Sequence, residues 1–260
     1  MTRRIFLEKL NFPSLPLYNV FSMKELNYQK EMEEILSKVV LENLQTNKRQ
    51  SLLLHACCGP CSSYVLELLA SVFDITIYYY NPNIHPEQEY CRRLEELKKF
   101  LKKFPPALEN KVKLVTDTYN PEEYFGAVGI EKEPELKNEP EKGERCRRCY
   151  SFRMKRSWDY ACSNGFQWFT TTLSISPHKD SKIINQIGRN LENSAENSKV
   201  KTRFLYSDFK KKGGFLRSTE LTDEYKMWRQ DYCGCIYSKV NREIQKQERL
   251  KNDGMQHGNK

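Results

Sequence analysis

The sequence predicts an α/β protein in which a mostly parallel sheet is flanked by helices, with helical additions at both ends of the chain. Two observations favour this fold. Strand patterns rich in β-branched and aromatic residues alternate with helical patterns between residues 27 and 175, and such alternation is typical of βαβ units. The chain of 260 residues also has 38% hydrophobic content, which is enough to bury a core.

The spacing of apolar residues predicts each element in turn. Residues 27–44 carry them on one helical face, which predicts an amphipathic helix. The apolar run at 51–56 predicts a buried strand, and the run at 74–83 predicts a strand that ends at turn residues. Residues 126–143 are rich in Glu, Lys, Pro and Gly, which predicts an exposed loop. Further helices are predicted at 62–73, 87–104 and 145–165, and further strands at 111–119 and 166–175.

This pattern divides the chain into three parts. Residues 1–26 contain two prolines and little periodicity, which indicates an irregular N-terminal extension. Residues 27–238 form a single catalytic α/β domain in this interpretation. Residues 239–260 are almost entirely polar, which predicts a solvated helix or a frayed tail.

The charge of the chain favours a polyanionic partner. The net charge is +9 and the pI is about 9.0, and basic side chains that face phosphates gain affinity through counterion release. Charge alone leaves RNA, DNA and acidic lipid open. No run of about 18 apolar residues and no signal peptide is recognisable, so we expect a cytoplasmic protein without a membrane segment.

Nine cysteines in a reducing compartment indicate metal or redox chemistry rather than structural disulfides. Cys57, Cys58 and Cys61 follow a predicted buried strand and lead into a helix, which is the favoured ligand position in an open α/β sheet. Cys146 and Cys149 have the spacing at which two thiolates can hold one metal centre.

Spacing does not decide what these cysteines hold. Cys57, Cys58, Cys146 and Cys149 could bind zinc or an iron–sulfur cluster, or remain unmetallated thiols. Three neighbouring arginines, Arg145, Arg147 and Arg148, are expected to keep the second pair ionised. The isolated Cys91 and Cys162 are expected to be small buried hydrophobic residues.

A third cysteine group distinguishes better between a structural and a redox role. Cys233 and Cys235 flank a single glycine, so a disulfide between them would close a small, strained and easily reduced ring. Such a pair favours a redox role, and the alternative is that both thiols are further metal ligands.

Taken as a set, six segments closely resemble the epoxyqueuosine reductases of the QueH type, from about Asn27 to Ser238. They occur in the family's order and are HACCGPCSSYVLE, IYYYNPNIHPEQEY, ERCRRCYSFRM, FTTTLSISPHKD, SDFKKKGGFLRSTEL and YKMWRQDYCGCIYS. The resemblance implies a Rossmann-like sheet similar to nucleotide-binding HUP folds. It also implies the last step of queuosine biosynthesis in tRNA, in which the epoxide of epoxyqueuosine at the wobble position of GUN anticodons is reduced.

The resemblance further implies the cofactor and the site residues. A 4Fe-4S cluster would be held by Cys57, Cys58, Cys146 and Cys149, the redox-active pair would be Cys233 and Cys235, and cobalamin would not be needed. We also expect an additional mononuclear iron near Cys61 and Asp231. An external electron donor would be needed as well.

The reaction needs protons as well as electrons, and the substrate needs a binding surface. His55, Asp180, Asp231 and Tyr232 lie inside the motifs and are candidate proton donors. The basic segments KKFLKKF, RCRRCYSFRMKR and DFKKKGGFLRS are candidate phosphate contacts. Aromatic residues near them are candidates for stacking on unpaired bases, and these are Tyr150, Phe152, Phe209, Phe215 and Trp228.

Two other functions compete with the reductase. One is a zinc-stabilised RNA-binding protein without redox activity, which the same cysteine pairs and basic loops would suit. The other is ATP-dependent tRNA thiolation, against which the missing phosphate-binding loop counts.

Overall fold

The computed structural model describes residues 26–194 and 201–257. The predicted irregular extension at 1–26 lies outside these residues apart from Leu26. The strands are β1 (Gln50–His55), β2 (Phe73–Tyr79), β3 (Lys113–Thr116), β4 (Trp168–Thr171) and β5 (Arg203–Phe204). The helices are α1 (Tyr28–Thr46), α2 (Gly59–Leu69), α3 (Glu87–Leu101), α4 (Pro105–Glu109), α5 (Pro121–Val128), η1 (Pro134–Asn138), α6 (Glu144–Ser163), η2 (Thr172–Ile175), α7 (Ser181–Ser194), α8 (Gly214–Glu224) and α9 (Ile236–His257).

The five strands form one parallel sheet in the order β3-β2-β1-β4-β5. This confirms the predicted α/β fold, its mostly parallel sheet and its helical additions at both ends. Because successive strand residues point to opposite faces, Leu52 and Leu54 pack on one face of β1, whereas Leu53 packs on the other. Both faces are therefore buried under helices.

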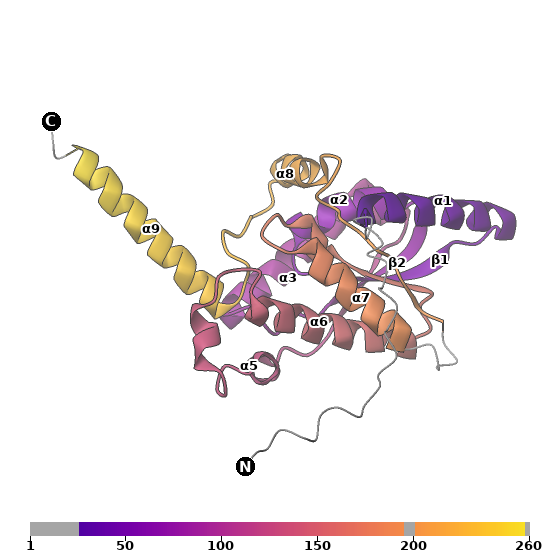
Figure 1. Ribbon diagram of the computed structural model, residues 1–260. Helices are drawn as coiled ribbons and strands as arrows, with labels where there is room; N and C mark the ends of the chain where they lie inside the picture. The colour runs from indigo at the N-terminus through magenta and orange to yellow at the C-terminus, as the bar shows by residue number, and fades with distance from the viewer. Residues whose placement is uncertain (1–25, 195–200, 258–260) are drawn as a thin grey trace, which may run out of the picture.

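Two apolar layers cover the sheet. The larger layer contains side chains of α1, α2, α3 and α8, and the opposite layer contains side chains of α6 and α7. The tyrosine run follows the same alternation, with Tyr79 in the first layer and Tyr78 and Tyr80 in the second. Figure 1 shows these helices around the central strands.

Helix α9 departs from the rest of the molecule. It extends away from the sheet and its covering helices (Figure 1). A helix was one of the two states predicted for the polar C-terminal segment, and it begins at Ile236, before that segment. Among the described residues, no helix has the length and apolar character needed to cross a bilayer.

Three expectations about local structure were wrong. Residues 126–143 are not merely an exposed loop, because α5 ends and η1 lies within them and Val128, Ile130 and Leu136 are buried. The predicted strand at 166–175 ends at Thr171, and a 3-10 turn follows. Cys91 is exposed and Cys162 is half-buried, so neither is a fully buried hydrophobic residue.

Candidate functional site

The site lies where the sheet changes its winding direction. From β1 the chain adds β2 and β3 on one side, whereas β4 and β5 lie on the other side. The loops that leave neighbouring strands at such a point diverge and open a crevice at the carboxyl ends of the strands. Cys57 lies two residues after the end of β1, and its Sγ lies 4.0 Å from the hydroxyl oxygen of Thr172, which follows β4.

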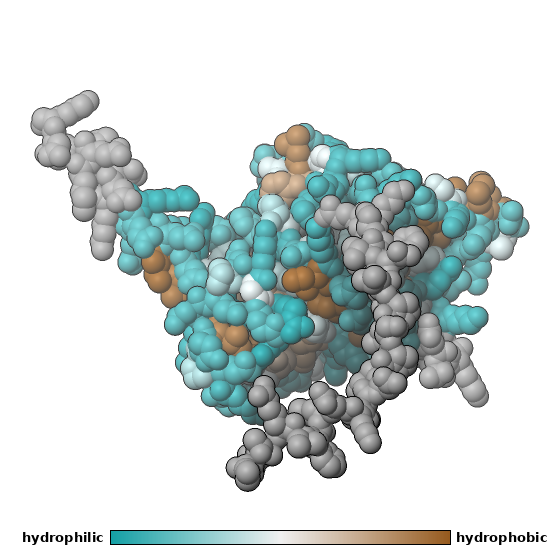
Figure 2. Space-filling view, viewed as in Figure 1, coloured by the Kyte–Doolittle hydropathy of each residue, from teal (hydrophilic) through white to brown (hydrophobic). Residues whose placement is uncertain are grey.

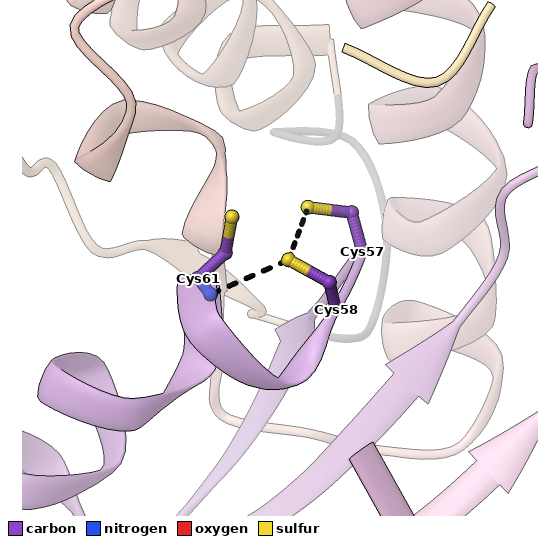
Figure 3. A group of neighbouring side chains, drawn as sticks. All are labelled: Cys57, Cys58 and Cys61. Atoms are coloured by element: carbon purple, nitrogen blue, oxygen red, sulfur yellow. Dashed lines mark hydrogen bonds between the residues drawn. The ribbon is translucent and has the colours of Figure 1, made fainter. Parts of the chain in front are cut away.

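Three cysteines converge in this crevice. Cys58 is the N-cap of α2, and its Sγ accepts a hydrogen bond from the backbone N–H of Cys61 at 3.3 Å. The sulfurs of Cys57 and Cys58 are 3.8 Å apart, and the three Sγ atoms all lie within 4.8 Å of one another. Figure 3 shows the three side chains at the start of α2. Among the described residues they form the one group with this spacing, and they could bind a metal.

The three thiols share one environment but differ in acidity. Hydrogen bonds with Cys58 and Cys61 lower the pKa of the Cys57 thiol well below its usual value. Burial raises the pKa of Cys58 to about 12, and hydrogen bonds with Cys57 and Cys58 raise that of Cys61. One thiolate is thus favoured within the group, and thiolates are the form in which cysteine binds metals.

The second cysteine pair lies at the start of α6. Cys146 and Cys149 are both buried, and Cys149 belongs to the same apolar cluster as Cys235. Burial raises the pKa of Cys146 to about 11 and that of Cys149 to about 12, and the charge of Cys233 adds to both effects. The first turns of α6 therefore lie close to the third cysteine group.

Backbone contacts hold that third group in place. Gly234, between the two cysteines, has φ +130°, which side-chain-bearing residues rarely adopt. Arg93 of α3 is 1% exposed and donates hydrogen bonds to the carbonyl oxygens of Cys233 at 3.0 Å and Tyr232 at 3.3 Å. The backbone N–H of His85 donates to the carbonyl of Gly234 at 2.9 Å.

The loop before the third group also contacts the first one. The side-chain amide of Gln230 donates a hydrogen bond to the Sγ of Cys58 at 3.1 Å. The loop at 230–235 thus adjoins Cys58 on one side and α6 on the other. The structure brings all three predicted cysteine groups to the same end of the sheet.

Two buried cations, Arg153 and Lys179, interact electrostatically with cysteines of more than one group. Arg153 is 1% exposed, donates a hydrogen bond to the side-chain oxygen of Asn81, and acts electrostatically on Cys57, Cys149 and Cys233. Burial alone would lower the pKa of the Lys179 ammonium group. The charges of Cys233, Cys57 and Cys61 outweigh burial, so the pKa is raised.

The arginines expected to play this part are engaged elsewhere. Arg147 and Arg148 form ion pairs with Glu144, and Arg148 also pairs with Glu133. Arg145 donates its hydrogen bonds to backbone carbonyls of residues 136, 137 and 139. Arg153 lies two turns further along the same helix, in a segment that the sequence analysis predicted to contact phosphate.

A cavity of about 690 Å³ opens beside the cysteines. Cys61 and Cys233 both line it, together with Lys179 and Tyr232. Phe215 also lines it and lies 5.1 Å from the guanidinium carbon of Arg229, measured to the ring centroid. The first turns of α9 complete the wall, so the cavity extends beyond Ser238, where the predicted catalytic domain ends.

The candidate proton donors are mostly engaged or remote. His55 is fully buried, its ring nitrogens contact Thr171 and the carbonyl of Tyr80, and burial lowers its pKa to about 3. Asp180 accepts two backbone hydrogen bonds at the start of α7. Asp231 and Tyr232 line the cavity, but the Asp231 carboxylate pairs with Lys246, which lowers the pKa of that carboxyl.

Sequence reasoning did not single out Lys179 and misjudged two aromatic residues. Lys179 belongs to the SISPHKD segment, and its position soon after a buried strand was the signal available. Tyr150 and Phe209 are buried and not free to stack on bases. Phe215 alone of the five aromatic candidates lines the cavity.

A second cavity of about 730 Å³ adjoins the first and shares Pro177 and Lys179 with it. Lysines dominate its wall, against the two acids Asp180 and Asp208. They are Lys142, Lys179, Lys182, Lys210, Lys211 and Lys212. Three of them, Lys210, Lys211 and Lys212, come from the DFKKKGG segment predicted to contact phosphate. The cysteine-lined cavity therefore adjoins a basic one.

Comparison with known proteins assigns this arrangement to a family. The family profile described as epoxyqueuosine reductase QueH matches residues 52–241. The chain is 39% identical over 223 residues to the epoxyqueuosine reductase QueH of Streptococcus pyogenes serotype M1, covering 85% of this chain and 82% of that protein. Similar proteins of the same name occur in Staphylococcus epidermidis, at 34% identity over 85% of this chain and 88% of that protein, and in Haemophilus influenzae, at 39% over 72% and 71%. The chain therefore belongs to the epoxyqueuosine reductase QueH family and is an oxidoreductase.

Proposed function

We propose that this protein reduces the epoxide of epoxyqueuosine at the wobble position of tRNA, which completes queuosine biosynthesis in the cytoplasm. The observation that carries the proposal is that Cys61 and Cys233, from distant segments of the chain, line one cavity beside the buried cysteines. A polar substrate in that cavity would lie within reach of both thiol groups.

The residues present fit an iron–sulfur cluster. Cys57, Cys58, Cys146 and Cys149 offer four buried sulfurs at one end of the sheet, and cluster ligands are thiolates whose charge must be compensated. Arg93 and Arg153 supply buried positive charge beside them. When bound, a 4Fe-4S cluster supplies electrons one at a time.

The close approach of Cys61 to Cys57 and Cys58 also suits a second, mononuclear iron near Cys61 and Asp231. The carboxylate of Asp231 is paired with Lys246, so binding an iron there requires it to exchange that partner. Metal analysis distinguishes a protein with the cluster alone from one that also binds a mononuclear iron, because the second iron raises the iron content.

The dithiol of Cys233 and Cys235 matches the electron count of the reaction. Two thiols that close to a disulfide release two electrons and two protons. Both carbon–oxygen bonds of the epoxide break, a carbon–carbon double bond forms, and the oxygen leaves as water. The sum is epoxide plus dithiol giving alkene, water and disulfide, after which an external electron donor restores the thiols.

The adjoining basic cavity supports tRNA as the substrate. Six lysines against two acids create a site for the phosphate groups that flank the modified nucleotide. The shared residue Lys179 places this site directly beside the cysteine-lined cavity.

The test is incubation with tRNA carrying epoxyqueuosine under reducing, oxygen-free conditions, followed by mass analysis of the nucleosides. Loss of one oxygen is expected. Unchanged epoxyqueuosine with a brown, iron-loaded protein would contradict the proposal. A colourless protein with stoichiometric zinc would favour a non-catalytic RNA-binding function instead.

Two cysteine substitutions separate the proposed roles. Cys233→Ser is expected to abolish turnover while the visible absorbance of the cluster remains, because the residue stores electrons and does not bind the cluster. Cys146→Ser is expected to remove absorbance and activity together. Loss of the absorbance in Cys233→Ser would place Cys233 among the metal ligands.

A further inference from the structure

Lys179 occupies an unusual position between the two cavities. Its side chain lines both of them although the residue is only 7% exposed. Its backbone N–H donates to the carbonyl of Ser176 at 3.2 Å. Within residues 26–194 and 201–257, its ammonium group has no hydrogen bond and no ion pair, although lysine almost never lies buried without a partner. The ammonium is therefore available to a molecule in the cavity.

The tyrosine and the two carboxyl groups that face the cysteine-lined cavity have partners. The Tyr232 hydroxyl donates to the carbonyl of His85 at 2.9 Å, and Asp231 is ion-paired with Lys246. The carboxylate of Glu141 lies 3.7 Å from His178. Arginine does not give up its proton in proteins, which excludes Arg229 and Arg242. His55 is fully buried and lines neither cavity.

The proposed reaction needs a proton at the oxygen that leaves. When a carbon–oxygen bond of the epoxide breaks, the oxygen becomes a strongly basic alkoxide. A positioned proton donor accelerates such a step by a factor of about 100 to 10,000. A side chain on the wall of the cavity can supply this proton.

On the basis of the proposed reductase function, we propose that Lys179 is the general acid of the reaction, whose ammonium protonates the epoxide oxygen as the first carbon–oxygen bond breaks. Cys233 lines the same cavity, so a proton released as the dithiol closes can return to the lysine. The second thiol proton completes the water molecule. The balance stays epoxide plus dithiol giving alkene, water and disulfide, and Lys179 ends the cycle protonated.

The test compares Lys179→Arg, which keeps the charge but does not transfer a proton, with Lys179→Ala, which removes both. The measured quantity is the single-turnover rate of oxygen loss from tRNA at saturating protein. Both variants are expected to lose about 100- to 10,000-fold in this rate, with cluster absorbance and iron content close to wild type. The charge kept in Lys179→Arg is expected to preserve tRNA affinity, and saturating protein offsets any weaker binding by Lys179→Ala. Added methylamine is expected to restore activity to Lys179→Ala but not to Lys179→Arg.

Lys113→Ala is the matched control, because Lys113 is 65% exposed on β3 and pairs with Asp74. Near wild-type rates in Lys179→Arg would overturn the proposal. They would show that the positive charge at position 179 is sufficient and that no proton is transferred from it. Weaker tRNA binding with an unchanged rate at saturation would make Lys179 a phosphate contact, and loss of the cluster would make its role structural. Oxygen loss by the wild type reports on the reductase function itself, so failure of that function is recognised separately.

Discussion

At the scale of single residues, the redox pair depends on a backbone conformation that its sequence motif requires. Gly234 has φ +130°, and an added Cβ would lie 3.1 Å from both the Arg93 guanidinium and the side chain of Ile84. Neither neighbour has room to move, because Ile84 and Arg93 are both 1% exposed. The glycine between Cys233 and Cys235 therefore sets the direction of the two thiols.

Gly234→Ala is expected to reduce turnover by about tenfold or more, because strain of about 1–3 kcal/mol is relieved by moving the two thiols. Cluster absorbance is expected to remain. The measurement is oxygen loss from tRNA beside the visible spectrum. Gly126→Ala is the control, since no atom lies within 4 Å of an added Cβ there. Wild-type turnover in Gly234→Ala would show that the loop conformation does not matter.

The cysteines were predictable from the sequence, but the charges around them were not. Clusters of cysteines can be recognised directly in the sequence. Which cations lie beside their thiolates depends on how the chain folds. Arg147 and Arg148 adjoin Cys146 and Cys149 in sequence but point to acids. Arg153 and Lys179 are distant from Cys57 in sequence, and only the packing of α6 and of the segment after β4 brings them close.

At the scale of elements, a carboxylate joins the end of β3 to α6. Asp117 accepts hydrogen bonds from Arg156 at 2.8 Å and from the hydroxyl of Tyr78. Burial opposes its ionisation, but hydrogen bonds from Arg156 and Tyr78 outweigh burial and lower the pKa to about 2, from 3.8. The edge of the sheet is thereby tied to the helix that carries Cys146 and Cys149.

Asp117→Asn is expected to lower the free energy of unfolding by about 1 kcal/mol at pH 6, because Arg156 is half exposed and screening reduces the full effect. The folded pKa lies below the unfolded value. The contribution is therefore complete above about pH 4 and is lost as the pH falls towards 2. Urea unfolding of the iron-free protein at pH 6 and pH 3 measures the difference, which is expected to shrink by about half.

Asp159→Asn removes an exposed pair on the same helix and is expected to change stability little. If the Asp117→Asn difference grew on acidification, the carboxylate would not be held by its two donors.

Apolar periodicity predicted the central elements because both faces of the sheet are buried. It failed where charged residues dominate a segment, as at 126–143, where Val128, Ile130 and Leu136 are buried among them. It also gave no sign of β5, which contains two residues, Arg203 and Phe204. A strand of two residues is too short to show an alternation of apolar and polar side chains.

At the scale of the whole molecule, the chain is basic, and one of its cavities is lined by six lysines. Most of the surface is hydrophilic, as Figure 2 shows for one face. The net charge of +9 is shared by many segments, but α3 neutralises part of its own, with Lys98 paired to Glu95 and Lys99 to Glu96. In the lysine-lined cavity beside the cysteines, Lys210 pairs with Asp208 and Lys212 with Glu33. The proposed tRNA substrate makes its remaining lysines the expected phosphate contacts.

Lys142→Gln combined with Lys211→Gln is expected to weaken tRNA binding and to reduce the slope of log affinity against log salt by about 2. Each lysine that faces a phosphate releases about one counterion on binding. Binding is measured over a salt series. Lys98→Gln combined with Lys99→Gln removes the same charge from α3 and is expected to leave the slope nearly unchanged. Equal effects of the two double variants would mean that only net charge matters.

The most direct measurement is a single turnover of the fully reduced protein with epoxyqueuosine tRNA and no external electron donor, with tRNA and protein both analysed by mass. The account predicts that each epoxide loses one oxygen while one disulfide forms between Cys233 and Cys235. Oxygen loss with both thiols still reduced, or a disulfide formed without oxygen loss, would contradict it.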